Sequence, residues 1–224
     1  TSEPQRLHAL QLADPTAKRF LDEEKFERVQ RRAREIKARV TPDLPPGIKA
    51  ELRPYQRDGF HFLAYLSSNH FGGILADDMG LGKTLQTLTW LAWLRTAEGT
   101  TAGTSSNGDA RSPVDKPLPS LVVCPKSVCD NWRAEAEKFV DGLRVRVWAT
   151  DDVKSLPAMV GTADLHIINY AQLRTVGEGL ARTDFQAVIL DEGQYIKNPS
   201  SQTAMVARML RSEHRLVLSG TPIE

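Results

Sequence analysis

A short apolar segment, a glycine-rich loop and a helix-forming segment follow one another between residues 73 and 94. Residues 73–76 are mostly apolar, residues 79–84 read Met-Gly-Leu-Gly-Lys-Thr, and residues 84–94 favour a helix. In this order the loop can turn its backbone N–H groups around a phosphate, and the positive end of the helix dipole favours the same anion. The sequence therefore predicts a phosphate-binding loop between a strand and a helix.

The side chains that end this loop suit a nucleoside triphosphate. Lys83 can reach the β- and γ-phosphates, and the Thr84 hydroxyl can join the coordination shell of a magnesium ion. Asp77 occupies the place of the first glycine in the general phosphate-loop pattern. We expect ATP and Mg²⁺ as the bound groups.

Other apolar segments alternate with helical patterns along the chain, which favours a mainly parallel α/β sheet flanked by helices. Ligands of such sheets bind at the carboxyl ends of the strands. The expected strands are residues 73–76, 120–124, 144–148, 165–168, 187–190 and 215–218. The expected helices are residues 54–66, 84–94, 128–140 and 201–210.

Two further segments divide the chain. Residues 16–40 have the periodicity of an amphipathic helix, and the Pro-rich residues 41–47 then end it. We expect an N-terminal extension over residues 1–46 and the main domain over residues 47–224. Residues 96–119 are rich in Gly, Thr, Ser, Asp and Pro, which predicts a flexible, dispensable insertion.

Composition and charge indicate where the protein acts more than what it does. The formal charge of the 224 residues is +1, so a nucleic-acid site must be local. One basic run, residues 28–39, fits either a solvated helix face or a DNA contact. No apolar run could span a membrane, and Cys124 and Cys129 have no zinc-like spacing. We expect reduced thiols, an intracellular protein, no membrane partner and no structural zinc.

Asp191 and Glu192 follow the apolar residues 187–190, so two carboxylates are expected at a strand end. Asp191 can hold magnesium directly or through water, and Glu192 can orient and deprotonate an attacking water. Acidic residues often end strands for no chemical reason. Here they follow a phosphate loop within the same expected sheet, which favours Lys83, Asp191 and Glu192 as the catalytic set.

Three ordered motifs resemble those of the Swi/Snf branch of helicase superfamily two. They are Asp-Asp-Met-Gly-Leu-Gly-Lys-Thr at 77–84, Asp-Glu-Gly-Gln at 191–194 with Ile-Lys-Asn at 196–198, and Leu-Ser-Gly-Thr-Pro at 218–222. Leu-Arg-Pro-Tyr-Gln at 52–56 resembles the upstream adenine-recognition motif, which makes Gln56 the expected adenine reader. The resemblance implies a RecA-like P-loop NTPase lobe. It assigns these further residues to the nucleotide: Arg53, Asp78, Met79, Gly80, Leu81, Gly82 and Leu85.

The same resemblance implies a double-stranded DNA partner. Residues 121–127 with Asn131 and Trp132 look like motif Ia, and Ile168-Asn169-Tyr170 looks like the next DNA-facing strand end. It assigns phosphate-backbone contacts to Lys126, Ser127, Asn169 and Tyr170. The Trp132 ring favours a core position over base stacking, whereas the Tyr170 ring fits either.

In the family, Ser219, Gly220 and Thr221 would couple the nucleotide state to DNA. Two positions depart from the usual motifs, Asp78 in place of glutamate and Gly193 in place of alanine. The resemblance also implies a second RecA-like lobe, after Glu224, whose arginines complete the ATP site. The expected location is cytoplasmic and nucleoid-associated in a prokaryote, or nuclear in a eukaryote.

The resemblance predicts the first lobe of an ATP hydrolase that translocates on DNA to remodel or displace bound protein. One alternative is a strand-separating helicase of the same superfamily, against which the Met-Gly-Leu-Gly-Lys-Thr and Ile-Lys-Asn signatures argue. A second alternative is an ATP-gated DNA-binding module without turnover. The carboxylates and Lys83 argue against it for a two-lobed protein, although an isolated lobe would behave in this way.

Overall fold

The computed structural model describes residues 39–76, 80–96 and 117–220. The chain divides into two compact units, Thr1–Thr41 and Pro42–Glu224, and every element given below belongs to the second. Pro42 lies within this unit, where its carbonyl oxygen is 3.2 Å from His61 Nε2. Most of the expected N-terminal helix and of the 96–119 insertion lies outside the described residues. The boundary expected at Gly47 stays a prediction.

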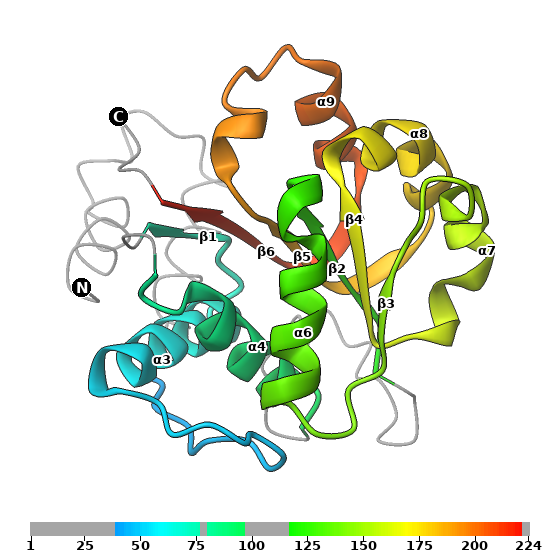
Figure 1. Cartoon of the computed structure of the whole chain (residues 1–224). Helices are drawn as coiled ribbons and strands as arrows, with labels where there is room; N and C mark the ends of the chain where they lie inside the picture. The colour runs from blue at the N-terminus through cyan, green and yellow to red at the C-terminus, as the bar shows by residue number, and fades with distance from the viewer. Residues whose placement is uncertain (1–38, 77–79, 97–116, 221–224) are drawn as a thin grey trace, which may run out of the picture. The chain divides into compact units, whose positions relative to one another are not determined.

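A single parallel sheet of six strands organises the main unit (Figure 1). The strands are β1 (Gly73–Ala76), β2 (Ser120–Cys124), β3 (Val145–Val147), β4 (Leu165–Asn169), β5 (Asp184–Leu190) and β6 (Arg211–Ser219). Their order across the sheet is β1-β6-β5-β2-β4-β3. All five strand pairs are parallel, so every carboxyl end meets the same edge. The predicted fold class is confirmed.

Burial along the strands follows their position in the sheet. Every residue of β2 is buried, and so is every residue of β5 after Asp184. Central parallel strands are covered on both faces, which explains their continuous apolar sequences. The end strands β1 and β3 are only partly buried.

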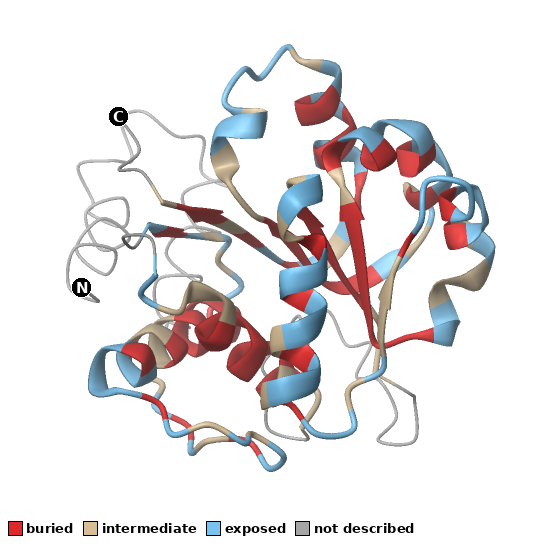
Figure 2. Ribbon diagram, viewed as in Figure 1, coloured by how far each residue is buried: buried red, intermediate tan, exposed pale blue. Residues whose placement is uncertain are grey.

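Helices cover the sheet in two groups that Figure 1 shows on opposite faces. The first group contains α3 (Pro54–Ser68), α4 (Lys83–Leu94) and α6 (Cys129–Phe139), in which α4 contacts both other helices. The second contains α7 (Leu156–Met159), α8 (Tyr170–Leu180) and α9 (Gln202–Met209), in which α8 contacts both others. Figure 2 shows buried positions concentrated where these helices meet the sheet.

Short 3-10 turns complete the connections. They are η2 (Lys126–Val128), η3 (Val153–Ser155), η4 (Val160–Thr162) and η5 (Gly193–Ile196). Among the described helices none combines the length and apolar character needed to cross a membrane.

Helix α8 was not among the sequence predictions, because two glycines weaken its helical pattern. The packing explains one of them. A Cβ at Gly177 would lie 1.9 Å from Val206 Cγ1 of α9, so the two helices approach too closely there for any side chain. A capping box was the missed signal: Asn169 Oδ1 accepts from Gln172 N, and Gln172 Oε1 accepts from Asn169 N.

Strands β5 and β6 begin earlier than the apolar runs suggested, at Asp184 and Arg211. These two residues pair across the strands, and Arg211 Nε lies 3.0 Å from Asp184 Oδ1. In β6 the first three residues, RSE, are polar and exposed or only partly buried. In β5 Phe185 and Gln186 are already buried, but the polar Gln186 separates Phe185 from the apolar run and so hid the earlier start of the strand.

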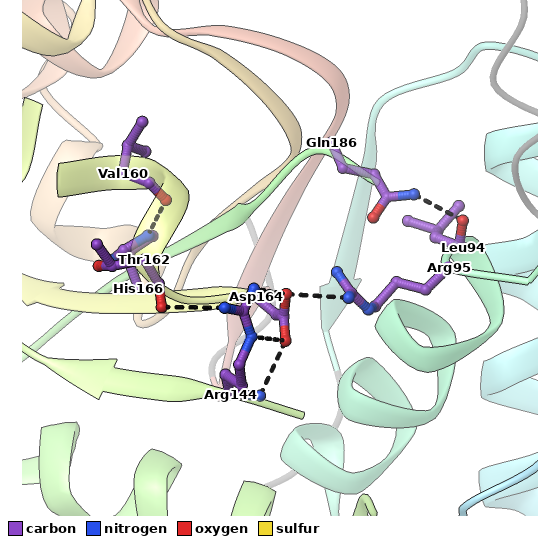
Figure 3. Close-up of polar contacts among 8 residues, drawn as sticks. All are labelled: Leu94, Arg95, Arg144, Val160, Thr162, Asp164, His166 and Gln186. Carbon is purple, nitrogen blue, oxygen red and sulfur yellow. Dashed lines mark hydrogen bonds and ion pairs between the residues drawn. The ribbon is translucent and has the colours of Figure 1, made fainter. Parts of the chain in front are cut away.

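A polar network ties the elements at this amino-terminal edge (Figure 3). The buried Asp164 carboxylate, just before β4, pairs with Arg144 before β3 and with Arg95 at the end of α4. Gln186 of β5 donates from Nε2 to the Leu94 carbonyl oxygen at 2.6 Å. These contacts join the end of helix α4 to β5 and to the residues just before β3 and β4, and they leave the opposite edge to the segments that carry the candidate site.

Candidate nucleotide-binding site and DNA-facing edge

The phosphate loop leaves β1 after Ala76 and enters α4 at Lys83. Gly80 and Gly82 have φ angles of 86° and 76°, a left-handed conformation that glycine adopts without strain. A Cβ at Gly82 would lie 2.4 Å from Gln56 Nε2, so a larger residue here would displace the end of the Gln56 side chain. The expected order of strand, glycine loop and helix is confirmed, while Asp78 and Met79 lie outside the described residues.

Helix α4 supplies the positive end of its dipole to this loop. Its first turn begins with Lys83 and Thr84, both partly exposed, and Leu85 turns into the core. The first backbone N–H groups of a helix have no partner within it, which makes the end of the loop suited to an anion. Leu81 is exposed, and its carbonyl oxygen accepts a hydrogen bond from Gln86 Nε2 at 3.3 Å.

Gln56 connects the start of α3 to the phosphate loop. Its Oε1 accepts from Arg53 N at 3.0 Å, and its Nε2 donates to the Leu81 carbonyl oxygen at 3.4 Å. The side chain is buried, whereas that of Arg53 is exposed. Gln56 therefore lies beside the loop, as expected of an adenine reader, but an adenine base would have to replace these two hydrogen bonds.

Asp191 and Glu192 follow β5, and four hydrogen bonds hold Asp191. Its N donates to the Val123 carbonyl oxygen at 2.8 Å. Its Oδ2 accepts from Trp132 Nε1 at 2.8 Å, and its Oδ1 accepts from Glu192 N at 2.9 Å. Its carbonyl oxygen accepts from the Tyr170 hydroxyl at 2.6 Å. Asp191 is thus fixed at both its backbone and its carboxylate.

Burial dominates the electrostatics of this carboxylate and raises the pKa of Asp191. The Trp132 hydrogen bond and the positive charge of Lys83 act in the opposite direction and lower it. Lys83 is therefore among the charged groups that act on the Asp191 carboxylate. A divalent cation beside Asp191 would offset the remaining cost of burying its charge.

The donor atoms available here fit magnesium. A carboxylate has about four lone-pair sites, and the two protein donors to Asp191 leave sites on both oxygens. Mg²⁺ is usually held by one or two protein oxygen ligands together with phosphates and water. The Asp191 carboxylate and the Thr84 hydroxyl are that kind of donor set.

Glu192 adopts a left-handed backbone conformation, with φ 56° and ψ 66°. Non-glycine residues rarely adopt this conformation, and it is found where the surroundings impose it. Glu192 Oε2 accepts from Gln194 Nε2 at 2.9 Å. The conformation turns the chain sharply at the strand end, so the side chains of Asp191 and Glu192 receive different surroundings.

The expected DNA-facing residues follow β2 and β4, which are neighbouring strands. Lys126 and Ser127 are exposed on η2. Asn169 uses its side-chain oxygen to cap α8, accepting from Ala171 N and Gln172 N at 3.0 Å each. The Asn169 side chain therefore already has a structural role, while Lys126 and Ser127 are accessible.

The rings of Tyr170 and Trp132 belong to the core, with 4% and 1% exposure. The core position expected for Trp132 is confirmed, and burial decides the open question about Tyr170 in the same way. Tyr170 stacks on Tyr195 with ring centroids 4.9 Å apart. Neither ring is available as a platform for a base, and both donate hydrogen bonds to Asp191. The motifs had not indicated these bonds.

Ser219 ends β6 and pairs with Ala76, the last residue of β1. It is buried, and Gly220 is the last described residue before the undescribed Thr221. Ser219 and Gly220 therefore follow a strand end that lies beside the end of β1, from which the phosphate loop begins.

Cys124 and Cys129 are free thiols, as expected, and both are buried. Their sulfur atoms lie 3.5 Å apart on either side of the η2 turn. Hydrogen bonding between the two thiols and burial raise the pKa of Cys124, whereas the same hydrogen bond lowers the pKa of Cys129.

A solved structure and two proteins from yeast are similar to this chain. The "Sulfolobus solfataricus SWI2/SNF2 ATPase core in complex with dsDNA" is similar, with a TM-score of 0.67 and 34% identity over 81% of this chain and 34% of that chain. The "TATA-binding protein-associated factor MOT1" of Saccharomyces cerevisiae is 38% identical over 186 residues, which are 81% of this chain and 10% of that protein. The "ISWI chromatin-remodeling complex ATPase ISW2" of the same yeast is 32% identical over 188 residues, 81% of this chain and 15% of that protein.

The chain thus spans about a tenth of the length of MOT1. A family model described as the SNF2-related domain matches residues 55–224, which include the phosphate loop, Asp191 and Glu192. The fold is that of the RecA-like SNF2 ATPase core, and the chain belongs to the SNF2-related domain family.

Proposed function

We propose that this chain is the ATP-binding lobe of a DNA-dependent ATPase that moves along double-stranded DNA. The observation that carries the proposal is that Lys83, the partly buried Asp191 and the exposed Lys126 lie in the segments that follow the carboxyl ends of three strands of a single parallel sheet. This edge is where parallel α/β sheets bind their ligands. The similarity to an ATPase core solved with double-stranded DNA supports the same reading.

At the nucleotide, Lys83 would contact the β- and γ-phosphates, and Gln56 would recognise adenine. Thr84 and Asp191 would hold magnesium, which when bound neutralises charge on the phosphates. Glu192 would orient the attacking water and accept its proton. Hydrolysis of this kind depends mainly on positioning and charge neutralisation, so it needs no covalent intermediate with the protein.

At the DNA, Lys126, Ser127 and the backbone around Asn169 and Tyr170 would contact phosphates. Such contacts position a protein on a duplex and do not read its sequence. Ser219 and Gly220 leave the sheet beside the phosphate loop, where they would relay the nucleotide state. The protein would act inside the cell, on nucleoid or nuclear DNA, and would displace or remodel DNA-bound protein.

A second RecA-like lobe would complete the ATP site with arginines. Arginines of this kind contribute on the order of 10³-fold or more to phosphoryl transfer in related enzymes. The chain alone is therefore expected to bind Mg·ATP and to hydrolyse it very slowly. A DNA-stimulated turnover of about 1 s⁻¹ from the chain alone would contradict the need for the second lobe.

The nucleotide site is tested by titrating a fluorescent ATP analogue into the purified chain with Mg²⁺ present. Lys83→Ala should weaken binding by about tenfold or more, because it removes a charge-assisted contact to phosphate. Lys154→Ala is the matched control, since Lys154 is exposed on η3 and far from the phosphate loop in sequence. Equal affinity of the two variants and the unmodified chain would exclude the proposed site.

Movement along DNA is tested in the full-length protein by displacement of a third strand from triplex DNA. ATP-driven displacement that leaves the underlying duplex intact is the expected result. Separation of the duplex strands would instead indicate a strand-separating helicase. ATP binding without displacement or hydrolysis would indicate an ATP-gated binding module.

A further inference from the structure

Two aromatic side chains donate hydrogen bonds to different parts of Asp191, one to its side chain and one to its main chain. Trp132 Nε1 bonds the carboxylate at Oδ2, whereas the Tyr170 hydroxyl bonds the main-chain carbonyl oxygen. That carbonyl belongs to the peptide unit between Asp191 and Glu192, so its orientation helps to set the left-handed turn at Glu192. Trp132 therefore contacts the carboxylate, and Tyr170 contacts the peptide unit through which the chain enters Glu192.

Both donors also lie just after the strand ends that carry the proposed DNA contacts. Trp132 is on the first turn of α6, which continues directly from the η2 turn that carries Lys126 and Ser127. Tyr170 is the first residue of α8, directly after the capping residue Asn169. A shift of either turn on binding a phosphate backbone would move the start of the following helix and its aromatic residue.

The buried rings suit a mechanical link of this kind. Both are almost inaccessible to solvent, and Tyr170 stacks within 6° of parallel on Tyr195 of η5, just beyond Glu192. Close-packed side chains transmit small displacements because no free space absorbs them. Each ring ends in a single polar donor, and for both rings that donor bonds Asp191.

We infer that Trp132 and Tyr170 are positioning residues that connect the two DNA-facing strand ends to Asp191 and Glu192. The inference rests on the proposed function and adds the route by which DNA regulates the ATP site. Trp132 would set the magnesium affinity of Asp191, and Tyr170 would set the placement of Glu192. Duplex DNA would thus tighten magnesium-dependent nucleotide binding through α6 and α8.

The test measures how tightly the purified chain binds an ATP analogue as the Mg²⁺ concentration is raised. EDTA gives the metal-free reference. Each titration is done once without DNA and once with a blunt duplex. Trp132→Phe removes the N–H donor and retains an aromatic ring. It should weaken the apparent Mg²⁺ affinity by about tenfold or more, as loss of a hydrogen bond to a metal ligand typically does. Binding in EDTA should stay the same, a difference that general destabilisation would not produce.

Trp90→Phe is the matched control. Trp90 is equally buried on α4 and donates its Nε1 to Ser67 Oγ at 2.7 Å, so the same substitution removes a buried indole bond that does not involve Asp191. Its Mg²⁺ affinity should equal that of the unmodified chain. Duplex DNA should tighten Mg²⁺-dependent binding about fivefold or more in the unmodified chain and in the control, but not in Trp132→Phe.

Tyr170→Phe gives a second, milder variant, because it removes only a hydroxyl group. In the full-length protein it should lower kcat for ATP hydrolysis about tenfold with little change in KM, as displacement of Glu192 alone would do. Unchanged Mg²⁺ affinity in Trp132→Phe, or a DNA effect equal to that of the control, would overturn the inference while leaving the proposed function intact. Absence of Mg·ATP binding by the unmodified chain would overturn both.

Discussion

The Arg144 guanidinium donates two hydrogen bonds to the Asp164 carboxylate, with Nε 3.0 Å from Oδ2 and Nη2 2.7 Å from Oδ1 (Figure 3). The backbone N of Arg144 adds a third bond to Oδ2, and Arg95 Nη2 lies 3.0 Å from Oδ1. Burial raises the pKa of Asp164, but these contacts with Arg144 and Arg95 outweigh it, so the pKa lies below its usual value. The pair therefore stabilises the folded state only while Asp164 is ionised.

Asp164→Asn should lower the free energy of unfolding by about 1–3 kcal/mol, because it weakens several charge-assisted hydrogen bonds at a buried position. Urea denaturation at neutral pH measures the difference. The contribution should be complete above the unfolded pKa of about 3.9 and should be lost as the pH falls through the lower folded pKa. Asp141→Asn removes an exposed pair with Lys49 and should leave stability unchanged.

Gly177→Ala should destabilise the domain, although alanine usually improves a helix by about 0.5–1 kcal/mol. The new Cβ would lie 1.9 Å from Val206 Cγ1, and relieving that clash should cost about 1–3 kcal/mol. Gly161→Ala is the control, since a Cβ there would meet nothing within 4 Å. Urea midpoints of both variants provide the comparison, and equal midpoints would show that α8 and α9 can separate at no cost.

The adjacent carboxylates at the end of β5 should respond differently to loss of charge. Glu192→Gln should keep Mg·ATP affinity and abolish hydrolysis in the full-length protein, because it removes the proposed base and keeps the shape. Asp191→Asn should weaken Mg²⁺-dependent nucleotide binding by about tenfold, because it removes a metal ligand. Nucleotide titrations with and without Mg²⁺ separate the two, and equal losses of affinity would contradict these roles.

Lys126→Ala should weaken binding of the chain to duplexes of unrelated sequence by a similar factor. Each phosphate contact contributes about −0.9 to the slope of log K against log salt, so this variant should reduce the slope by about one contact. Lys138→Ala, at the other end of α6, is the matched control. Fluorescence anisotropy over a salt series measures both variants. If deletion of residues 1–40 abolishes binding and Lys126→Ala has no effect, the basic run at 28–39 is the DNA contact instead.

Contiguous motifs made the strand, glycine loop and helix of the candidate nucleotide site predictable from the sequence. A phosphate loop needs only one strand, one turn and one helix, so residues 73–94 contain its whole signal. The bond from Trp132 to Asp191 joins residues 59 positions apart, and no local pattern reports it. Tyr170 presented the same difficulty, because an aromatic residue at a strand end fits a core or a surface equally well until the neighbouring helix is placed.

Helix α8 shows the opposite case, in which local preference opposed the fold. Gly177 lowers helix propensity, yet the contact with Val206 requires it, and that contact becomes visible only in three dimensions. The lengths of β5 and β6 were underestimated because polar residues interrupt the apolar pattern near the start of each strand: the buried Gln186 in β5, and Arg211, Ser212 and Glu213 in β6.

The position of β1 in the sheet has a consequence for the order in which the molecule can be made. Among the described strands β1 is paired with β6 alone, and β6 is the last of these strands to be synthesised. Until residues 211–219 have left the ribosome, β1 has no partner and the loop after it has no rigid support. The strands β2, β4 and β5 can already associate by then. A nascent chain should therefore acquire its central sheet before it can hold a nucleotide, and ligand binding should appear late in translation.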